Sequence, residues 1–133
     1  MGEFQKAIQD FNKAIDLAPD YAQAYSNRAN VYLNLQNLEA AINDYDKAIL
    51  LKPDYSDAYA NRGIAYVIKG NDKAAIDDYS KAIAINPKDG LAYFLRGMSN
   101  IKIGEKENAC KDYYKAQSLG FAEATEEIRK HCR

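Results

Sequence analysis

Residues 20–29 read DYAQAYSNRA, and the same pattern returns as DYSDAYANRG at 54–63 and as KDGLAYFLRG at 88–97. The starting points 20, 54 and 88 are separated by a constant step of 34 in residue number. The three prolines of the chain keep the same step and stand at Pro19, Pro53 and Pro87. A repeat period of this length indicates stacked supersecondary units. The sequence therefore predicts a repeat architecture.

Each unit contains two apolar patterns of helical spacing, which in the first unit fall at 24–32 and 38–49. Gly70 separates the two expected helices of the second unit. Each proline stands between the last helix of one unit and the first helix of the next, because a helix cannot continue through proline. Asp20, with Gln23 three residues later, predicts an N-cap and a capping box for the helix that follows. We therefore expect an all-α fold built from antiparallel helix pairs.

Small residues recur in step where neighbouring helices must approach closely, and tyrosines recur beside them. The small positions are Ala29/Gly63/Gly97, Ala41/Ala75/Ala109 and Ala48/Ala82/Ala116, and the tyrosines are Tyr45, Tyr79 and Tyr113. Together with the proline at the end of each repeat, these positions match the pattern of the tetratricopeptide repeat (TPR) family. The chain resembles this family over residues 22 to about 123. The resemblance implies a right-handed superhelical solenoid. The departures are Asn100 in place of Tyr32 and Tyr66, Gln36 in place of Gly70 and Gly104, and Phe121 in place of the next proline.

The period also predicts how one TPR domain over residues 1–133 is divided. We expect the second helix of a truncated repeat at 1–18, full repeats at 19–52, 53–86 and 87–120, and a polar capping helix at 121–133. The half repeat would expose an apolar face made of Phe4, Ile8, Phe11 and Ile15. This face indicates either a fragment of a longer array or a homo-oligomer that forms through the half repeat or the groove.

Composition and motif content argue against several functional classes. The chain has 18 Lys and Arg against 19 Asp and Glu, so it lacks the positive charge that nucleic-acid binding requires. Uncharged runs such as 29–38 are far shorter than the roughly 18 residues of a membrane span. There is one histidine, no glycine-rich phosphate loop and no Ser-His-Asp set, so we expect no enzyme, no cofactor and no metal site. The carboxylates Asp44, Asp46, Asp77 and Asp78 stand on second helices, at positions that recur as polar partners of Lys and Arg, and are interpreted as parts of solvated faces.

The two cysteines have more than one interpretation. In a hairpin that turns at Gly120 and Phe121, Cys110 and Cys132 lie opposite each other, which favours a disulfide and then an oxidising compartment. Otherwise Cys110 is a core residue equivalent to Ile42, and Cys132 is a free thiol. A metal site with His131 is the weakest interpretation, since three ligands at a terminus make a poor cage. The localisation is unknown.

The family resemblance implies that the first helices of successive pairs line a concave groove that holds a peptide segment. Carried over position by position, this groove contains Gln23, Asn27, Asn30, Asn34, Asp57, Asn61, Ile64, Ile68, Leu91, Phe94, Leu95 and Met98. Asparagine amides can hydrogen-bond to a peptide backbone, while the third unit offers an apolar stripe. If the capping helix covers this stripe, the apolar residues serve packing instead.

One subset of the family clamps the acidic tails of heat-shock chaperones with lysine and arginine. The match fails here because Ser26, Leu91 and Leu95 stand where the cations would be. We therefore expect a non-catalytic scaffold that binds a protein or peptide partner in the groove. The alternatives are a self-assembling structural spacer and a regulatory segment of a larger enzyme.

Overall fold

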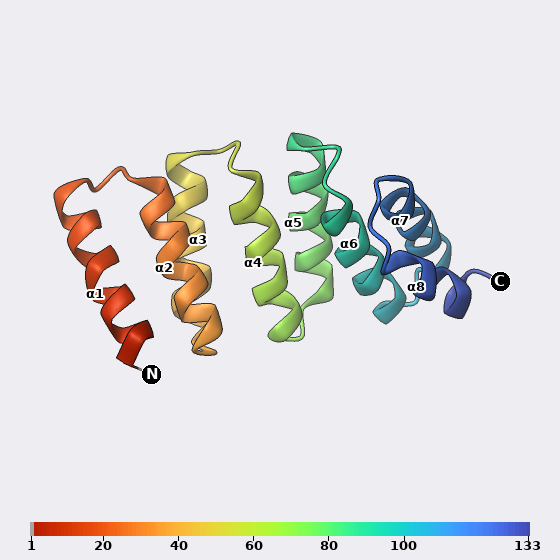
Figure 1. Ribbon diagram of the computed structural model, residues 1–133, viewed down its shortest axis with the longest axis horizontal. Coiled ribbons are helices and arrows are strands. Elements are labelled where there is room, and N and C mark those ends of the chain that lie inside the picture. The colour runs from red at the N-terminus through yellow and green to blue at the C-terminus, as the bar shows by residue number, and fades with distance from the viewer. Residues whose placement is uncertain (1) are drawn as a thin grey trace.

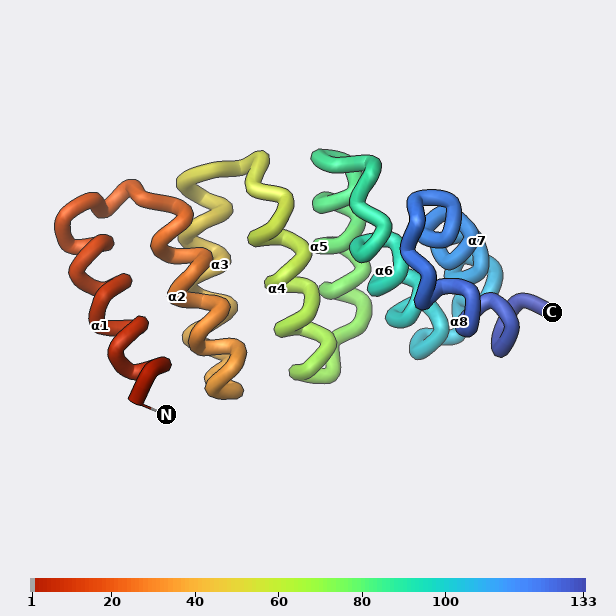
Figure 2. Tube along the Cα trace, in the orientation of Figure 1, coloured from red at the N-terminus to blue at the C-terminus, as the bar shows by residue number. Residues whose placement is uncertain are grey.

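The computed structural model describes residues 2–133, and over this range it contains eight helices and no strands. Met1, the first residue of the expected 1–18 segment, lies outside the described residues. The helices are α1 (Gly2–Leu17), α2 (Ala22–Asn34), α3 (Leu38–Leu51), α4 (Ser56–Ile68), α5 (Asp72–Ile85), α6 (Gly90–Lys102), α7 (Lys106–Ser118) and α8 (Ala124–His131). They follow one another along the long axis, with the two termini at opposite ends (Figures 1 and 2). The predicted solenoid of helix pairs is confirmed, with α2–α3, α4–α5 and α6–α7 as the full pairs.

A β-turn with proline at its second position joins each pair to the helix before it. In the first of these turns the backbone N–H of Tyr21 donates to the carbonyl of Ala18 at 3.0 Å, across Pro19. The same bond recurs across residues 52–55 and 86–89, at 3.1 and 3.2 Å. Proline suits this position because its fixed φ is the one that the turn requires. The prolines therefore set the boundaries between units.

The predicted N-cap at Asp20 is wrong. The N-cap of α2 is Tyr21, which makes no side-chain capping bond, because Asp20 still belongs to the turn and lies one residue too early. In the third unit Asp89 takes the place of Tyr21, and its carboxylate accepts a hydrogen bond from the backbone N–H of Ala92 at 3.2 Å. The capping pattern is thus present in this unit, one position later than expected.

The turn inside each pair needs a residue in the left-handed region. Gly70 and Gly104 adopt φ values of +89° and +85°, and Gln36 adopts +61° at the equivalent point of the first unit. After Gln36, the backbone N–H of Asn37 donates a hydrogen bond to the carbonyl of Tyr32 at 2.9 Å. This bond caps the C-terminal end of α2. Gln36 therefore keeps the turn despite its Cβ, and the departure from glycine leaves the fold unchanged.

Fully buried tyrosines on the second helices form the centre of each unit. Tyr45, Tyr79 and Tyr113 have at most 1% of their surface exposed, and buried alanines surround them. A Cβ added to Gly63 would lie 2.6 Å from the Tyr79 ring, which is closer than atoms can pack. A larger residue at position 63 would therefore require the Tyr79 ring to shift, whereas the first unit has Ala29 at the equivalent position beside Tyr45. The predicted close approach of the helices is present.

The two ends of the array are covered to different degrees. On α1, Ile8 and Ile15 are buried, whereas Phe4 is 37% exposed. The apolar face expected to meet water is therefore partly packed inside the fold. At the other end, α8 buries Ala124 and Ile128 and carries polar residues on its outer side.

Candidate functional site

The residues predicted to line a groove lie on α2, α4 and α6, the first helices of the three pairs. We call their shared surface the first-helix face. Gln23, Asn34, Asp57, Ile68, Leu91 and Met98 are exposed on their helices, and Asn27, Asn30, Asn61, Ile64, Phe94 and Leu95 are half-buried. By their contacts, these residues fall into three classes: Asn30 and Asn61 form an amide group, Ile64, Ile68, Leu95 and Met98 line an apolar pocket, and Phe94 packs against other rings.

The amide group joins the first two units. Oδ1 of Asn30 accepts hydrogen bonds from the hydroxyl of Tyr45 and from Nδ2 of Asn61, the latter at 3.3 Å. Since the Asn30 oxygen already has two protein donors, the group that Asn30 offers to a ligand is its N–H₂. The two asparagines predicted to bind a peptide backbone therefore lie together, held in place by a buried tyrosine.

The apolar pocket lies between α4 and α6 and has a volume of about 90 Å³. Ile64, Val67 and Ile68 line it from α4, and Leu95 and Met98 line it from α6, with Ser99 and Lys102 beside them and Tyr79 from α5. Ile68 and Met98 are 56% and 38% exposed, so the pocket has exposed apolar residues on both helices. This volume suits one aliphatic side chain better than a larger molecule.

Phe94 lies outside this pocket. Its ring centroid is 4.9 Å from that of Phe121 and 5.8 Å from that of Tyr113, and it packs against the cluster that holds α8. The prediction of Phe94 as a ligand anchor does not fit these contacts, because the chain turns at Gly120 and places Phe121 on this ring. Leu91, by contrast, is 46% exposed. Of the apolar stripe of the third unit, Phe94 therefore packs under the cap, whereas Leu91 is exposed on the surface.

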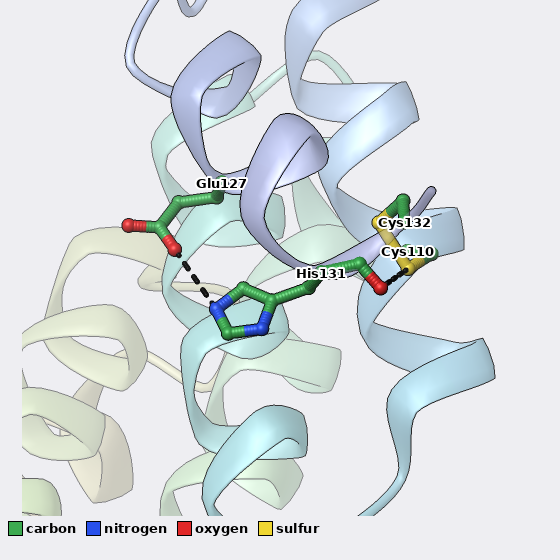
Figure 3. Close-up of a disulfide and its surroundings, with 4 residues drawn as sticks. All are labelled: Cys110, Glu127, His131 and Cys132. Carbon is green, nitrogen blue, oxygen red and sulfur yellow. Dashed lines mark hydrogen bonds and ion pairs between the residues drawn. A yellow bond between two sulfur atoms is a disulfide. The ribbon is translucent and has the colours of Figure 1, made fainter.

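The cysteines are bridged in the structure. Cys110 on α7 and Cys132, directly after α8, have Cα atoms 5.7 Å apart (Figure 3). Nε2 of His131 lies 3.3 Å from a carboxylate oxygen of Glu127. Burial, followed by the negative charge of Glu127, raises the pKa of the nearby Tyr113 hydroxyl to about 12. The disulfide between Cys110 and Cys132 therefore connects the end of α8 with α7, the second helix of the third unit.

Arginines on the first helices form a ladder that the sequence analysis missed. Nε and Nη2 of Arg62 donate to both oxygens of Asp78 at 2.9 and 2.7 Å, and Nη1 donates to Asp46 at 2.7 Å. The same fork joins Arg28 to Asp44 and Arg96 to Asp112. We call these three arginines the arginine ladder. Each connects the second helix of its own pair with the second helix of the preceding unit.

The ladder corrects the interpretation of the carboxylates as solvated. Asp44 and Asp78 are 7% and 4% exposed, whereas the side chain of Asp46 is 50% exposed. The hydrogen bonds to Asp78 raise the pKa of the Arg62 guanidinium above its ordinary value. Tyrosine rings also flank the arginines, since the Tyr59 ring centroid lies 5.5 Å from Cζ of Arg62. The signal available in the sequence was an arginine in every unit, followed each time by an aspartate at a separation of 16.

Over residues 2–133, no group of three His, Cys, Asp or Glu side chains is placed to hold a metal ion. Within that same range, no helix is both long enough and apolar enough to cross a membrane.

Family models match most of the chain. A model described as tetratricopeptide repeat matches residues 22–55 and 56–89, a TPR repeat model matches 1–36, and a second tetratricopeptide repeat model matches 91–119. The comparison with curated proteins gave no match.

Several solved structures share the fold. The crystal structure of MamA is 28% identical with a TM-score of 0.86, over 92% of this chain and 73% of that one. The first TPR of Spaghetti (RPAP3), bound to the HSP90 peptide SRMEEVD, is 29% identical with a TM-score of 0.81, over 84% and 90%. The Arabidopsis OM64 TPR domain is 25% identical with a TM-score of 0.76, over 83% and 95%.

Proposed function

We propose, from the premise that this chain belongs to the tetratricopeptide repeat family, that its first-helix face binds an extended segment of a partner protein. The family and its peptide-bound neighbour support a protein-interaction scaffold in general. Such scaffolds are typically non-catalytic, and we infer the same here. The proposal includes the division into a half repeat at 1–18, repeats at 19–52, 53–86 and 87–120, and a capping helix at 121–133.

The observation that carries the proposal is that the amide group and the apolar pocket share α4, on which Asn61 precedes the pocket residue Ile64 by one helical turn. An extended segment presents backbone polar groups and side chains in alternation. Asn30 and Asn61 offer amides to the backbone, and the pocket beside Ile68 and Met98 accepts one aliphatic side chain. We therefore expect the bound segment to carry a Leu, Ile, Val or Met as its anchor.

The test is selection from a random peptide library displayed on phage, followed by affinity measurement with the selected peptides. Ile68→Ser/Met98→Ser should weaken binding at least tenfold, because burying one such side chain is worth about 1.5–3 kcal/mol. The matched control is Leu50→Ser/Ile85→Ser, which removes two exposed apolar residues from the second helices and should leave binding unchanged. Equal loss in both variants would contradict the proposed groove.

The acidic peptide SRMEEVD provides a second control. Ser26, Leu91 and Leu95 occupy the positions where the clamp would need cations, so this peptide should bind much more weakly than the selected ones. Tight capture of SRMEEVD on this face would overturn the assignment of an aliphatic anchor.

Self-association is the second candidate function, and exposed apolar residues on α1 favour it. Phe4 is 37% exposed and Phe11 is half-buried, and the two lie on one face of the helix because they are seven residues apart. If this surface joins two copies, Phe4→Glu/Phe11→Glu should shift the chain towards monomer in sedimentation velocity. Leu50→Glu/Tyr114→Glu, which changes exposed residues elsewhere, should not. A monomer at every concentration in the unmodified chain would remove this candidate.

A further inference from the structure

The residues that surround the arginine ladder differ between the third unit and the first two. Four neighbours of Arg96 differ in kind from the residues at equivalent positions beside Arg28 and Arg62. Ser80 stands in place of Asn12 and Asp46, Asn100 in place of Tyr32 and Tyr66, Asn108 in place of Ala40 and Ala74, and Lys111 in place of Asn43 and Asp77. All four of the new residues are polar and none is acidic, so this part of the unit no longer repeats the others.

The change at Asn100 opens space. In the second unit the ring centroid of Tyr66 lies 5.9 Å from Cζ of Arg62, and the ring covers the guanidinium. Asn100 is shorter, and its Nδ2 is held by Asp112 at 3.2 Å, so it cannot cover Arg96 in the same way. A pocket of about 340 Å³ lies here, between α5, α6 and α7. The absence of the tyrosine ring explains the pocket.

The charge around the ladder also changes. Arg62 contacts two carboxylates, those of Asp46 and Asp78, and a third acidic residue, Asp77, stands at the position equivalent to Lys111. In the third unit Asp112 is paired with Arg96 through two bonds, at 2.9 and 2.7 Å. Lys111 has no carboxylate within 4.0 Å among residues 2–133. The pocket therefore holds one positive charge with no carboxylate in direct contact, and Glu107, which precedes Lys111 by one turn of α7, lines the neighbouring pocket with it.

We propose that this pocket binds a carboxylate group. Lys111 supplies the compensating charge, and Ser80, Asn100 and Asn108 supply a hydroxyl and amides that can donate to its oxygens. A carboxylate is favoured over a phosphate, which carries about two negative charges at neutral pH. The carboxylate comes either from an Asp or Glu side chain of a protein or from a free small acid. The inference does not depend on the first-helix face, because the pocket is lined by α5 and α7 and by another side of α6.

The test is an NMR titration of the ¹⁵N-labelled chain with three probes. N-acetylglutamate methylamide represents a protein side chain, propionate represents a small acid with one carboxylate, and N-acetylglutamine methylamide is the neutral control. We expect saturable shifts of the backbone amides of Ser80, Asn100, Asn108 and Lys111 with a carboxylate probe, at a Kd on the order of 1 mM. Shifts with N-acetylglutamate methylamide alone assign a protein side chain, and tighter binding of propionate assigns a small acid.

Variants separate the pocket from general surface charge. Lys111→Asp, which restores an acidic residue as at position 77, should abolish the shifts without disturbing the fold, since Lys111 is exposed. Asn100→Tyr should also abolish them by filling the pocket. Lys115→Gln, on the same helix but outside the pocket, should leave the Kd unchanged. The proposal is overturned if neither carboxylate gives saturable shifts, if the neutral probe gives the same ones, if inorganic phosphate binds more tightly, or if Lys111→Asp keeps them.

Discussion

Asp78→Ala is expected to lower the free energy of unfolding by about 3 kcal/mol, measured by urea titration. The Asp78 carboxylate is 4% exposed and receives two hydrogen bonds from Arg62. Without it, the guanidinium stays in a largely buried position, with Asp46 on the exposed side as its remaining carboxylate partner. The cost comes mostly from the Nε and Nη2 groups of Arg62, which lose their hydrogen-bond acceptors, since a buried ion pair contributes little over apolar residues of the same size.

The neighbouring residue provides the matched control. Asp77 is exposed and adjacent in sequence, so Asp77→Ala should change the free energy of unfolding by no more than about 0.5 kcal/mol. In the double variant Asp78→Leu/Arg62→Met both charges are removed, and a substantial part of the lost stability should return. Equal effects of Asp77→Ala and Asp78→Ala would show that the ladder contributes nothing specific.

Reduction of the Cys110–Cys132 bridge is expected to destabilise the C-terminal cap by roughly 3 kcal/mol, the value for closing a loop of roughly 20 residues. The helix α8 is short and buries only Ala124 and Ile128 against the rest of the fold. Since each element of a solenoid contacts mainly its neighbours, the effect should stay near the cap. Hydrogen exchange of residues 124–131 should accelerate under reductant, while that of α2 and α3 should not.

The control is Cys110→Ser/Cys132→Ser, whose exchange should be fast in the cap and indifferent to reductant. A thiol count on the oxidised chain gives an independent measurement. Two free thiols after mild oxidation, or identical exchange of the cap in both redox states, would show that Cys110 is only a packing residue.

Much of the fold could be predicted because it depends on short-range patterns. Helix pairs follow from apolar spacing within each helix, and unit boundaries follow from Pro19 and its two equivalents. The tyrosine core followed from the same register, since Tyr45, Tyr79 and Tyr113 share one environment. The N-cap was predicted at Asp20, but Asp20 belongs to the turn and the N-cap is Tyr21. Aspartate favours both places, so residue type alone does not distinguish the last turn position from the N-cap.

The candidate site was predicted less completely. The register correctly assigned its residues to the first helices, but it could not divide them by contact. Phe94 and Met98 have the same apolar character in sequence, and whether each lies under the cap or faces the surface depends on where Phe121 packs.

The period, the helix pairs and the family could be identified without a structure, because the same residue types recur at a fixed spacing along the chain. Which charged groups are buried, and where space is left, became clear only from the packing of the helices. The burial of Asp78 depends on Arg62, on another helix, and the pocket beside Arg96 depends on a side chain that is too short to fill it. Such features arise from distances between helices, which a repeat pattern does not specify.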